Sequence, residues 1–146
     1  MVQNSTTYYV WIGGSCDYGH KERAGGAAVV IEHGGSIISR DAISDFHTTE
    51  FRMMLTLMLK VMYALPDGSD LLFLTNAAYI QNFDKTPTAK SANPDLITQC
   101  IKAKTQHNSV SVKIVQYHKS PLLKETHDMA TEAMAKTRKE YYHDIK

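Results

Sequence analysis

The stretch YVWIGGSC, residues 9–16, joins a β-branched and aromatic run to two consecutive glycines. Its apolar part, from Tyr8 to Ile12, predicts a buried strand. We interpret Gly14-Ser15 as a tight turn after that strand, and Gly13 as the last position that faces the core. Glycine packs nothing there and adds entropy to the unfolded chain. The missing side chain at Gly13 therefore needs an explanation.

Length and composition indicate one ordinary globular domain. The chain has 146 residues, 43% of them hydrophobic and 21% charged, and this size allows a substantial core. A net charge of +1 argues against nucleic-acid binding by bulk charge but leaves room for a local basic patch. Cys16 and Cys100 lack metal-binding spacing, so we expect a reduced, cytoplasmic protein without zinc. No apolar run or signal-type N-terminus predicts a membrane span or export.

The first half of the chain predicts three strands and a helix. After the strand at 8–12, a second apolar run covers 27–31, and the hairpin signal at 33–36 leads to a return strand that starts at Ile37. Apolar residues then recur at helical spacing from about 48 to 65. Thr48 or Thr49 is the expected N-cap of this helix, and Pro66-Asp67-Gly68 ends it. Methionines 53, 54, 58 and 62 are interpreted as core residues rather than a soft-metal site.

The second half alternates strands and helices. The expected elements are a strand at 71–74, a helix at about 93–105, a strand at 110–115 and a helix at about 124–138. The continuous apolar run from Leu71 to Leu74 indicates a parallel strand that is buried on both faces. The order predicts an α/β fold with a mixed five-stranded sheet, in which three antiparallel strands precede the parallel ones and helices flank the sheet. We expect a single domain over 7–140, with flexible tails at 1–6 and 141–146.

Several short motifs at the ends of these elements form a recognisable series. They are Ile12-Gly13-Gly14-Ser15, then Gly25-Gly26 before a strand, Thr49-Glu50-Phe51 at a helix start, Thr75-Asn76-Ala77 after a strand, and His118 ten positions before Asp128. Over residues 8–138 this series resembles type 1 ribonuclease H, of the ribonuclease H-like superfamily. The resemblance implies a ribonuclease H-like fold.

The resemblance also implies a chemistry, namely two-metal hydrolysis of the RNA strand of an RNA–DNA hybrid. In the family, four carboxylates at the strand ends hold two divalent cations, and a mobile histidine helps the leaving step. Glu50, His118 and Asp128 match that pattern. Gly13 and Asn76 stand where the family has aspartates, so half of the expected carboxylates are absent.

Charge compensation decides how this difference is interpreted. Two dications about 4 Å apart repel each other by roughly 16 kcal/mol at an effective dielectric constant of about 20. Glu50 and Asp128 alone do not offset that repulsion, and Mg²⁺ binds weakly without carboxylates or substrate phosphates. We therefore predict a catalytically impaired or inactive domain that acts by binding nucleic acid (an RNA–DNA hybrid or RNA) or a protein. No cofactor is expected to bind tightly, and Mg²⁺ or Mn²⁺ would bind Glu50 and Asp128 at low affinity.

Other interpretations of these residues stay open. Asp17, Asp41 or Asp45 could act as relocated metal ligands of an active hydrolase, or all three could be solvated loop acids. Glu50 and Asp128 could simply favour the first turns of their helices, and His118 could be a solvated loop residue. Asn76 could also be a substitution introduced to disarm an enzyme.

Candidate contacts to nucleic acid are few. We expect Ser15 and four lysines to be involved: Lys102, Lys104, Lys119 and Lys124. The lysines could line a weakly basic groove, or they could be scattered solubilising residues. The segment 82–95 is short and carries only Lys85 and Lys90. A third alternative is a structural subunit, whose contacts would involve the polar segment 81–92 and the tail KEYYHDIK at 139–146.

Overall fold

Five strands form one mixed sheet in the order β3-β2-β1-β4-β5. The strands are β1 (Thr7–Cys16), β2 (Gly25–His33), β3 (Ser36–Asp45), β4 (Asp70–Thr75) and β5 (Ser109–Ile114). The computed structural model describes the backbone of residues 6–142 and the side chains of residues 6–140. Strand β1 pairs antiparallel with β2 and parallel with β4, and β4 pairs parallel with β5. The predicted mixed sheet is confirmed.

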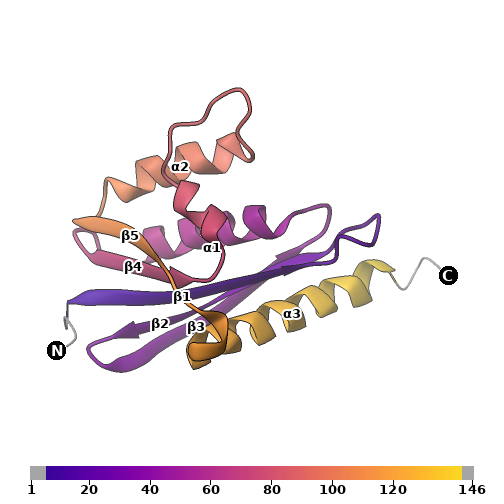
Figure 1. Ribbon diagram of the computed structural model, residues 1–146, viewed down its shortest axis with the longest axis horizontal. Coiled ribbons are helices and arrows are strands. Elements are labelled where there is room, and N and C mark those ends of the chain that lie inside the picture. Colours follow the sequence, from indigo (N-terminus) through magenta and orange to yellow (C-terminus); the bar gives the residue numbers. More distant parts are fainter. Residues whose placement is uncertain (1–5, 143–146) are drawn as a thin grey trace.

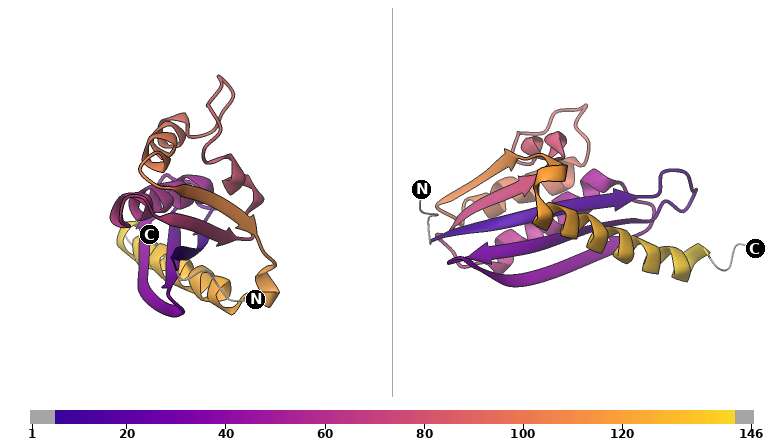
Figure 2. Two further views of the ribbon diagram at one scale, coloured as in Figure 1. Left: turned by 90° about the vertical axis from the view of Figure 1, so that its left-hand side faces the viewer. Right: turned by 60° about the horizontal axis from the view of Figure 1, so that its bottom comes forward.

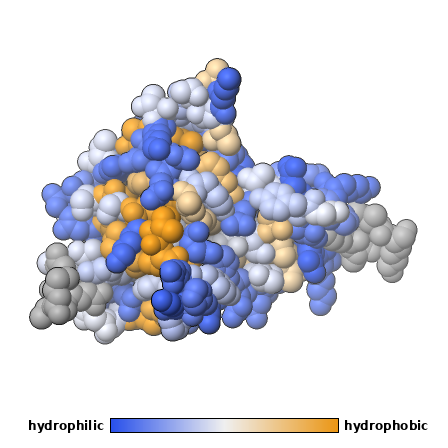
Figure 3. Space-filling model, in the orientation of Figure 1, coloured by the Kyte–Doolittle hydropathy of each residue, from blue (hydrophilic) through white to orange (hydrophobic). Residues whose placement is uncertain are grey.

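Helices cover the two faces of this sheet unequally (Figures 1 and 2). They are α1 (Glu50–Ala64), α2 (Pro94–Lys104) and α3 (Pro121–Tyr142), with short 3-10 turns η1 (Ala78–Asn82) and η2 (Tyr117–Lys119). Helices α1 and α2 pack together on one face, and α3 crosses β1, β2 and β3 on the other. On the face seen in Figure 3, apolar side chains gather over the β4–β5 part of the sheet.

The core lies between the sheet and helix α1. Residues such as Val10, Ile12 and Phe73 are completely buried there. Helix α1 contributes its apolar side, and the four methionines predicted as core residues, Met53, Met54, Met58 and Met62, are all buried. That prediction is confirmed. None of the helices in the described part of the chain is long and apolar enough to cross a membrane.

Three boundaries differ from the predictions. Strand β1 does not turn at Gly14-Ser15 but continues to Cys16, where it pairs with Gly25 of β2. Strand β3 extends to Asp45, so Asp41 and Asp45, which were considered as loop acids, belong to an edge strand. Helix α3 begins at Pro121, three residues before the predicted start, because proline suits the first turn of a helix. Most of the predicted tails, 1–5 and 143–146, lie outside the described residues.

The glycines at the end of β1 and the start of β2 allow close packing against helices. None of them has the positive φ that a turn requires. A Cβ on Gly14 would lie 2.8 Å from Cγ of Glu50 on α1, whereas one on Gly26 would lie only 2.4 Å from the backbone carbonyl oxygen of Ala130 on α3. The missing side chains therefore set the distance between the helices and the sheet.

The contact at Gly26 leads to a stability prediction. Gly26→Ala forces the α3 backbone away from the sheet, and overpacking of this kind costs about 1–3 kcal/mol. We expect urea unfolding to show that loss. Gly19→Ala is the matched control, because its Cβ would meet only Asp17 at an ordinary 3.7 Å, and it should change stability by less than about 0.5 kcal/mol. Equal effects of the two substitutions would contradict the packing role of Gly26.

Candidate functional site

The candidate site lies where β1 and β4 end beside each other. The two strands are parallel, so their carboxyl ends reach the same edge of the sheet. Gly13 lies near the end of β1, and Asn76 directly follows β4. Helix α1 starts on one side of this edge with Glu50, and the beginning of α3 packs on the other side. The topology thus brings together Gly13, Asn76 and Glu50, three of the positions that the sequence resemblance singled out.

Side chains of α3 occupy the space beside Gly13. A Cβ built on Gly13 would lie 2.5 Å from Oγ1 of Thr126 and 3.1 Å from Cδ2 of His127. Thr126 is completely buried, and its hydroxyl donates a 2.6 Å hydrogen bond to the carbonyl of Leu123. An aspartate at position 13 would have to displace both α3 side chains.

His127 connects this position to Asn76. Its Nε2 lies 3.0 Å from Oδ1 of Asn76. The imidazole also contacts the Tyr117 ring edge-on, with 5.0 Å between the ring centroids. Because the Asn76 oxygen can only accept, Nε2 is the protonated nitrogen in this hydrogen bond. Asn76, His127 and Tyr117 therefore form one contiguous group at the sheet edge.

Asp128 does not take the position expected for it. The residues of α3 nearest to Gly13 are Thr126 and His127, and Asp128 is exposed. Successive residues of a helix are rotated by about 100°, so Asp128 projects in a different direction from His127. No hydrogen bond or ion pair joins Asp128 to another described residue. His118, in η2, is also exposed, and it is the neighbouring Tyr117 that contacts the site.

Glu50 is the carboxylate that remains at this edge. Thr49 caps the helix as predicted, because its Oγ1 accepts a 3.1 Å hydrogen bond from the Arg52 N–H. The Glu50 N–H donates to the Tyr18 hydroxyl at 3.0 Å. The Glu50 carboxylate, at Oε1, accepts a 2.5 Å hydrogen bond from the Tyr79 hydroxyl. Glu50 is therefore held by a tyrosine at its backbone and another at its side chain.

Tyr79 is a permanent donor in this pair. Burial raises the pKa of the Tyr79 phenol far above its usual value, and the hydrogen bond and negative charge of Glu50 raise that pKa further. Tyr79 is therefore protonated at neutral pH and can donate to Glu50. A metal ion that approached the bound oxygen of Glu50 would have to compete with the phenol.

The acids considered as relocated ligands are engaged elsewhere. Asp41 forms an ion pair with Lys60, with 2.8 Å between Oδ2 and Nζ. Asp45 accepts a hydrogen bond from the Phe46 N–H, and Asp17 lies 3.8 Å from Arg138. Within residues 6–140, whose side chains are described, no group of three or more His, Cys, Asp or Glu side chains is placed to hold a metal ion.

The predicted nucleic-acid contacts do not form one groove. Lys102 and Lys104 lie at the end of α2, before β5, whereas Lys119 and Lys124 follow β5. A six-residue strand of about 20 Å separates the two pairs. Lys104 is also paired with Asp84 at 2.7 Å. The Ser15 hydroxyl donates to Sδ of Met134 on α3 at 3.6 Å, so Ser15 faces the helix.

Lys119 and Lys124 are the two predicted lysines near the site. Lys124 precedes His127 by three residues on α3, a spacing that places both on the same side of a helix. Lys119 belongs to η2, as does Tyr117, which contacts His127. Both lysines are exposed. On the α3 side of the candidate site, positive charge therefore comes from η2 and the start of α3.

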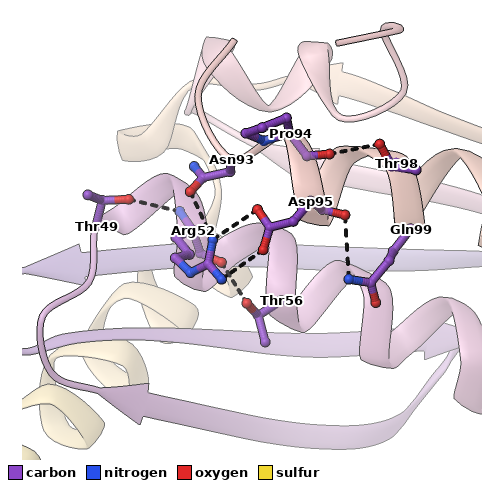
Figure 4. A network of polar contacts seen from close by, with 8 residues as sticks. All are labelled: Thr49, Arg52, Thr56, Asn93, Pro94, Asp95, Thr98 and Gln99. Carbon is purple, nitrogen blue, oxygen red and sulfur yellow. Dashed lines mark hydrogen bonds and ion pairs between the residues drawn. The ribbon is translucent and has the colours of Figure 1, made fainter. Parts of the chain in front are cut away.

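A polar network joins the start of helix α2, directly after the polar segment 81–92, to the start of helix α1 (Figure 4). Arg52 donates from both terminal nitrogens to Asp95, at 3.2 and 3.0 Å, and also to Oδ1 of Asn93 at 3.2 Å. The segment borders a pocket of about 320 Å³, whose lining includes Phe51, Lys85 and Ile97. The other predicted interaction segment, 139–146, lies largely outside the residues whose side chains are described.

Sequence reasoning missed Tyr79, Thr126 and His127. A tyrosine three residues after Asn76 has no spacing that marks it as a partner of Glu50. His127 stands directly before Asp128, and only the true start of α3 shows which of the two faces β1. Thr126 looks like an ordinary helix residue until its distance from Gly13 is known.

Comparisons with solved structures identify the fold. LC9-RNase H1, a type 1 RNase H with the type 2 active-site motif, is 18% identical, with a TM-score of 0.74 over 94% of this chain and 76% of that chain. RNase H1 from the halophilic archaeon Halobacterium salinarum NRC-1 is 15% identical, with a TM-score of 0.64 over 89% of this chain and 98% of that chain. No protein-family model and no curated protein matches the sequence. The chain has a ribonuclease H-like fold, as the motifs predicted.

The Arg52–Asp95 pair gives a prediction about pH. The hydrogen bonds from Arg52 lower the pKa of Asp95, so the pair stabilises the protein above the usual pKa of aspartate, and this contribution disappears as the pH falls through the lowered value. Asp95→Asn should cost up to about 1 kcal/mol at neutral pH. Urea unfolding at several pH values should show the difference from the parent chain shrinking in acid.

The control for this series is Asp67→Asn, which changes an exposed acid in the turn after α1. It should have little effect at any pH. A deficit of Asp95→Asn that stays constant down to strongly acidic pH would show that the ion pair is not its source.

Proposed function

We propose that this chain is a ribonuclease H-like domain that binds RNA–DNA hybrid without cleaving it. The observation that carries the proposal is the set of side chains at the end of β1 and β4. A glycine, an amide and an imidazole, from Gly13, Asn76 and His127, stand together there. Glu50 is the carboxylate beside them, and it is hydrogen-bonded to Tyr79.

The group does not fit a pair of divalent cations. Two neighbouring divalent cations need several anionic oxygens as ligands, because two dications about 4 Å apart repel each other by roughly 16 kcal/mol at an effective dielectric constant of about 20. Glycine offers no ligand, and the Asn76 oxygen is neutral and bonded to His127. We infer that Mg²⁺ or Mn²⁺ binds here at low affinity at most, and we assign no catalytic step to a metal.

The same replacements favour contact with a phosphate. A cluster of carboxylates without metal repels the nucleic-acid backbone, whereas Gly13, Asn76 and His127 carry no negative charge. Lys124 lies on the same side of α3 as His127, and Lys119 is in the adjoining turn. Such lysines attract phosphates, and each contact made adds to the salt dependence of binding. This site can therefore contact a phosphodiester directly, whereas a site with four carboxylates would contact it through metal ions.

A cleavage assay tests the catalytic part of the proposal. The purified chain is incubated with end-labelled RNA–DNA hybrid and Mg²⁺ or Mn²⁺. We expect no more cleavage than with Glu50→Gln, since the cation pair does not assemble. Cleavage clearly above that control would overturn the proposal and favour an active hydrolase with fewer ligands.

Restoring carboxylates gives the complementary test. Thr126 and His127 fill the space beside Gly13. The aspartate at position 13 would therefore clash in a variant that carries Gly13→Asp and Asn76→Asp but no change on α3. We expect activity to appear only when Thr126→Ala and His127→Asp are added, and to vanish again with Glu50→Gln. A parallel variant keeps His127 and carries the other three changes. If it is as active as the full set, Asp128 rather than position 127 supplies the fourth carboxylate.

Hybrid binding is tested separately, by fluorescence anisotropy over a series of salt concentrations. We expect metal-independent binding that weakens with salt, and Lys119→Gln/Lys124→Gln should lower the slope of log affinity against log salt by about 1 to 2. Lys60→Gln is the control, because Lys60 is paired with Asp41. Absence of binding at low salt, or an equal change in the control, would contradict the assigned surface.

A further inference from the structure

Strand β5 is the less protected edge of the sheet. The other edge, β3, carries Arg40 and Asp41, which form ion pairs with α3 and α1, and its pairing with β2 is interrupted by a register shift at Ile31/Glu32. Charges and bulges of this kind discourage pairing with another chain. Strand β5 has no proline, pairs with β4 without a shift and carries one charge, Lys113. It runs along the outer margin of the sheet in Figure 1.

The outward backbone groups of β5 can be identified. The Ser109 N–H donates to the Ser69 carbonyl, and the Val115 N–H donates to the Thr75 carbonyl at 2.9 Å. The odd-numbered residues therefore direct their N–H groups toward β4. Since backbone groups alternate along a strand, Val110 and Val112 present N–H and C=O outward. Within the described residues, no further backbone or side-chain hydrogen bond reaches these groups.

We propose that β5 pairs antiparallel with β5 of a second copy of this chain, with Ser111 opposite Ser111. In that register Val110 of each copy lies opposite Val112 of the other. Both valines direct their backbone groups outward, so they form hydrogen-bonded pairs across the new interface. β-Branched residues in opposite positions also stabilise a sheet. The two sheets then become one continuous sheet with a two-fold axis at Ser111.

Charge complementarity selects this occupant and this register. Asp70 accepts hydrogen bonds from Ser109 at 2.7 Å and from Asn108 at 2.6 Å, and these bonds lower its pKa, so it is ionised at neutral pH. Lys113 is exposed and has no ion-pair partner among the described residues. Centring on Ser111 places Lys113 opposite Ser109 of the second copy, beside that copy's Asp70. Each dimer then contains two such ion pairs.

Self-complementarity argues for a second copy over a different protein. The same edge supplies a cation, Lys113, and an anion, Asp70, which is bound to Ser109. Ser109 and Lys113 each lie two residues from Ser111, on either side of it. A two-fold interface uses one patch twice in this manner. A register centred on Val112 would instead place Lys113 opposite Ser111, farther from the carboxylate, and it would leave both charges unpaired.

Solution mass measurements across a concentration series test the interface. We expect the full chain to dimerise, and Lys113→Glu to raise the dissociation constant about tenfold, because two attractive contacts become repulsive. Adding Asp70→Lys to that variant should restore dimerisation. Lys90→Glu, the same charge change at an exposed lysine of the polar segment 81–92, is the matched control and should have no effect.

Cysteine cross-linking tests the register. Opposite residues in a non-hydrogen-bonded antiparallel pair have Cα atoms about 4.5 Å apart, within disulfide range. Ser111→Cys should therefore form a disulfide-linked dimer under mild oxidation, in greater yield than Val112→Cys or the parent chain, whose Cys16 is half-buried. A chain that is monomeric at every concentration, a dimer insensitive to Lys113→Glu, or preferential cross-linking at position 112 would overturn the proposal.

Discussion

Close approach of helix α3 to side-chain-free positions on β1 and β2 is the constraint on which this structure depends. At Gly26 the helix backbone itself occupies the place of a Cβ, and at Gly13 the Thr126 hydroxyl does so. The two glycines lie on the same face of the sheet, and α3 packs directly against them. The absence of a side chain at Gly13 is thus a packing feature as much as a chemical one.

This coupling explains why the residues of the candidate site have to be considered together. Any side chain at position 13 would displace His127, which in turn holds Asn76. Asn76, His127 and Gly13 are mutually compatible, and an aspartate introduced at position 13 would clash with Thr126 and His127. On the opposite side of the sheet, the Tyr79 hydroxyl donates a hydrogen bond to the Glu50 carboxylate, and this contact does not involve α3.

The fold was predictable from periodicity because burial dictates it. Alternating or continuous apolar runs marked the strands, and the methionine-bearing apolar side of α1 marked the helix that covers the core. The predicted turn at Gly14-Ser15 was wrong because glycine is a turn signal in most sequences, whereas here it allows a paired strand to contact α1. The role predicted for Asp128 stays a prediction, because a helix that starts at Pro121 brings Thr126 and His127 nearest to Gly13, which a count from His118 does not reveal.

The residue types at the candidate site also affect the energetics of the folded chain. Several acidic side chains held close together repel each other unless cations are bound, so a site of that kind favours function over stability in the metal-free state. Here Asn76 and His127 at the sheet edge are hydrogen-bonded to each other, and the Glu50 charge is stabilised by the Tyr79 hydroxyl. The candidate site is therefore internally satisfied without an ion. A phosphate that approaches it meets hydrogen-bond donors and lysines rather than a cluster of negative charge, and this difference is the physical basis of the binding without cleavage proposed above.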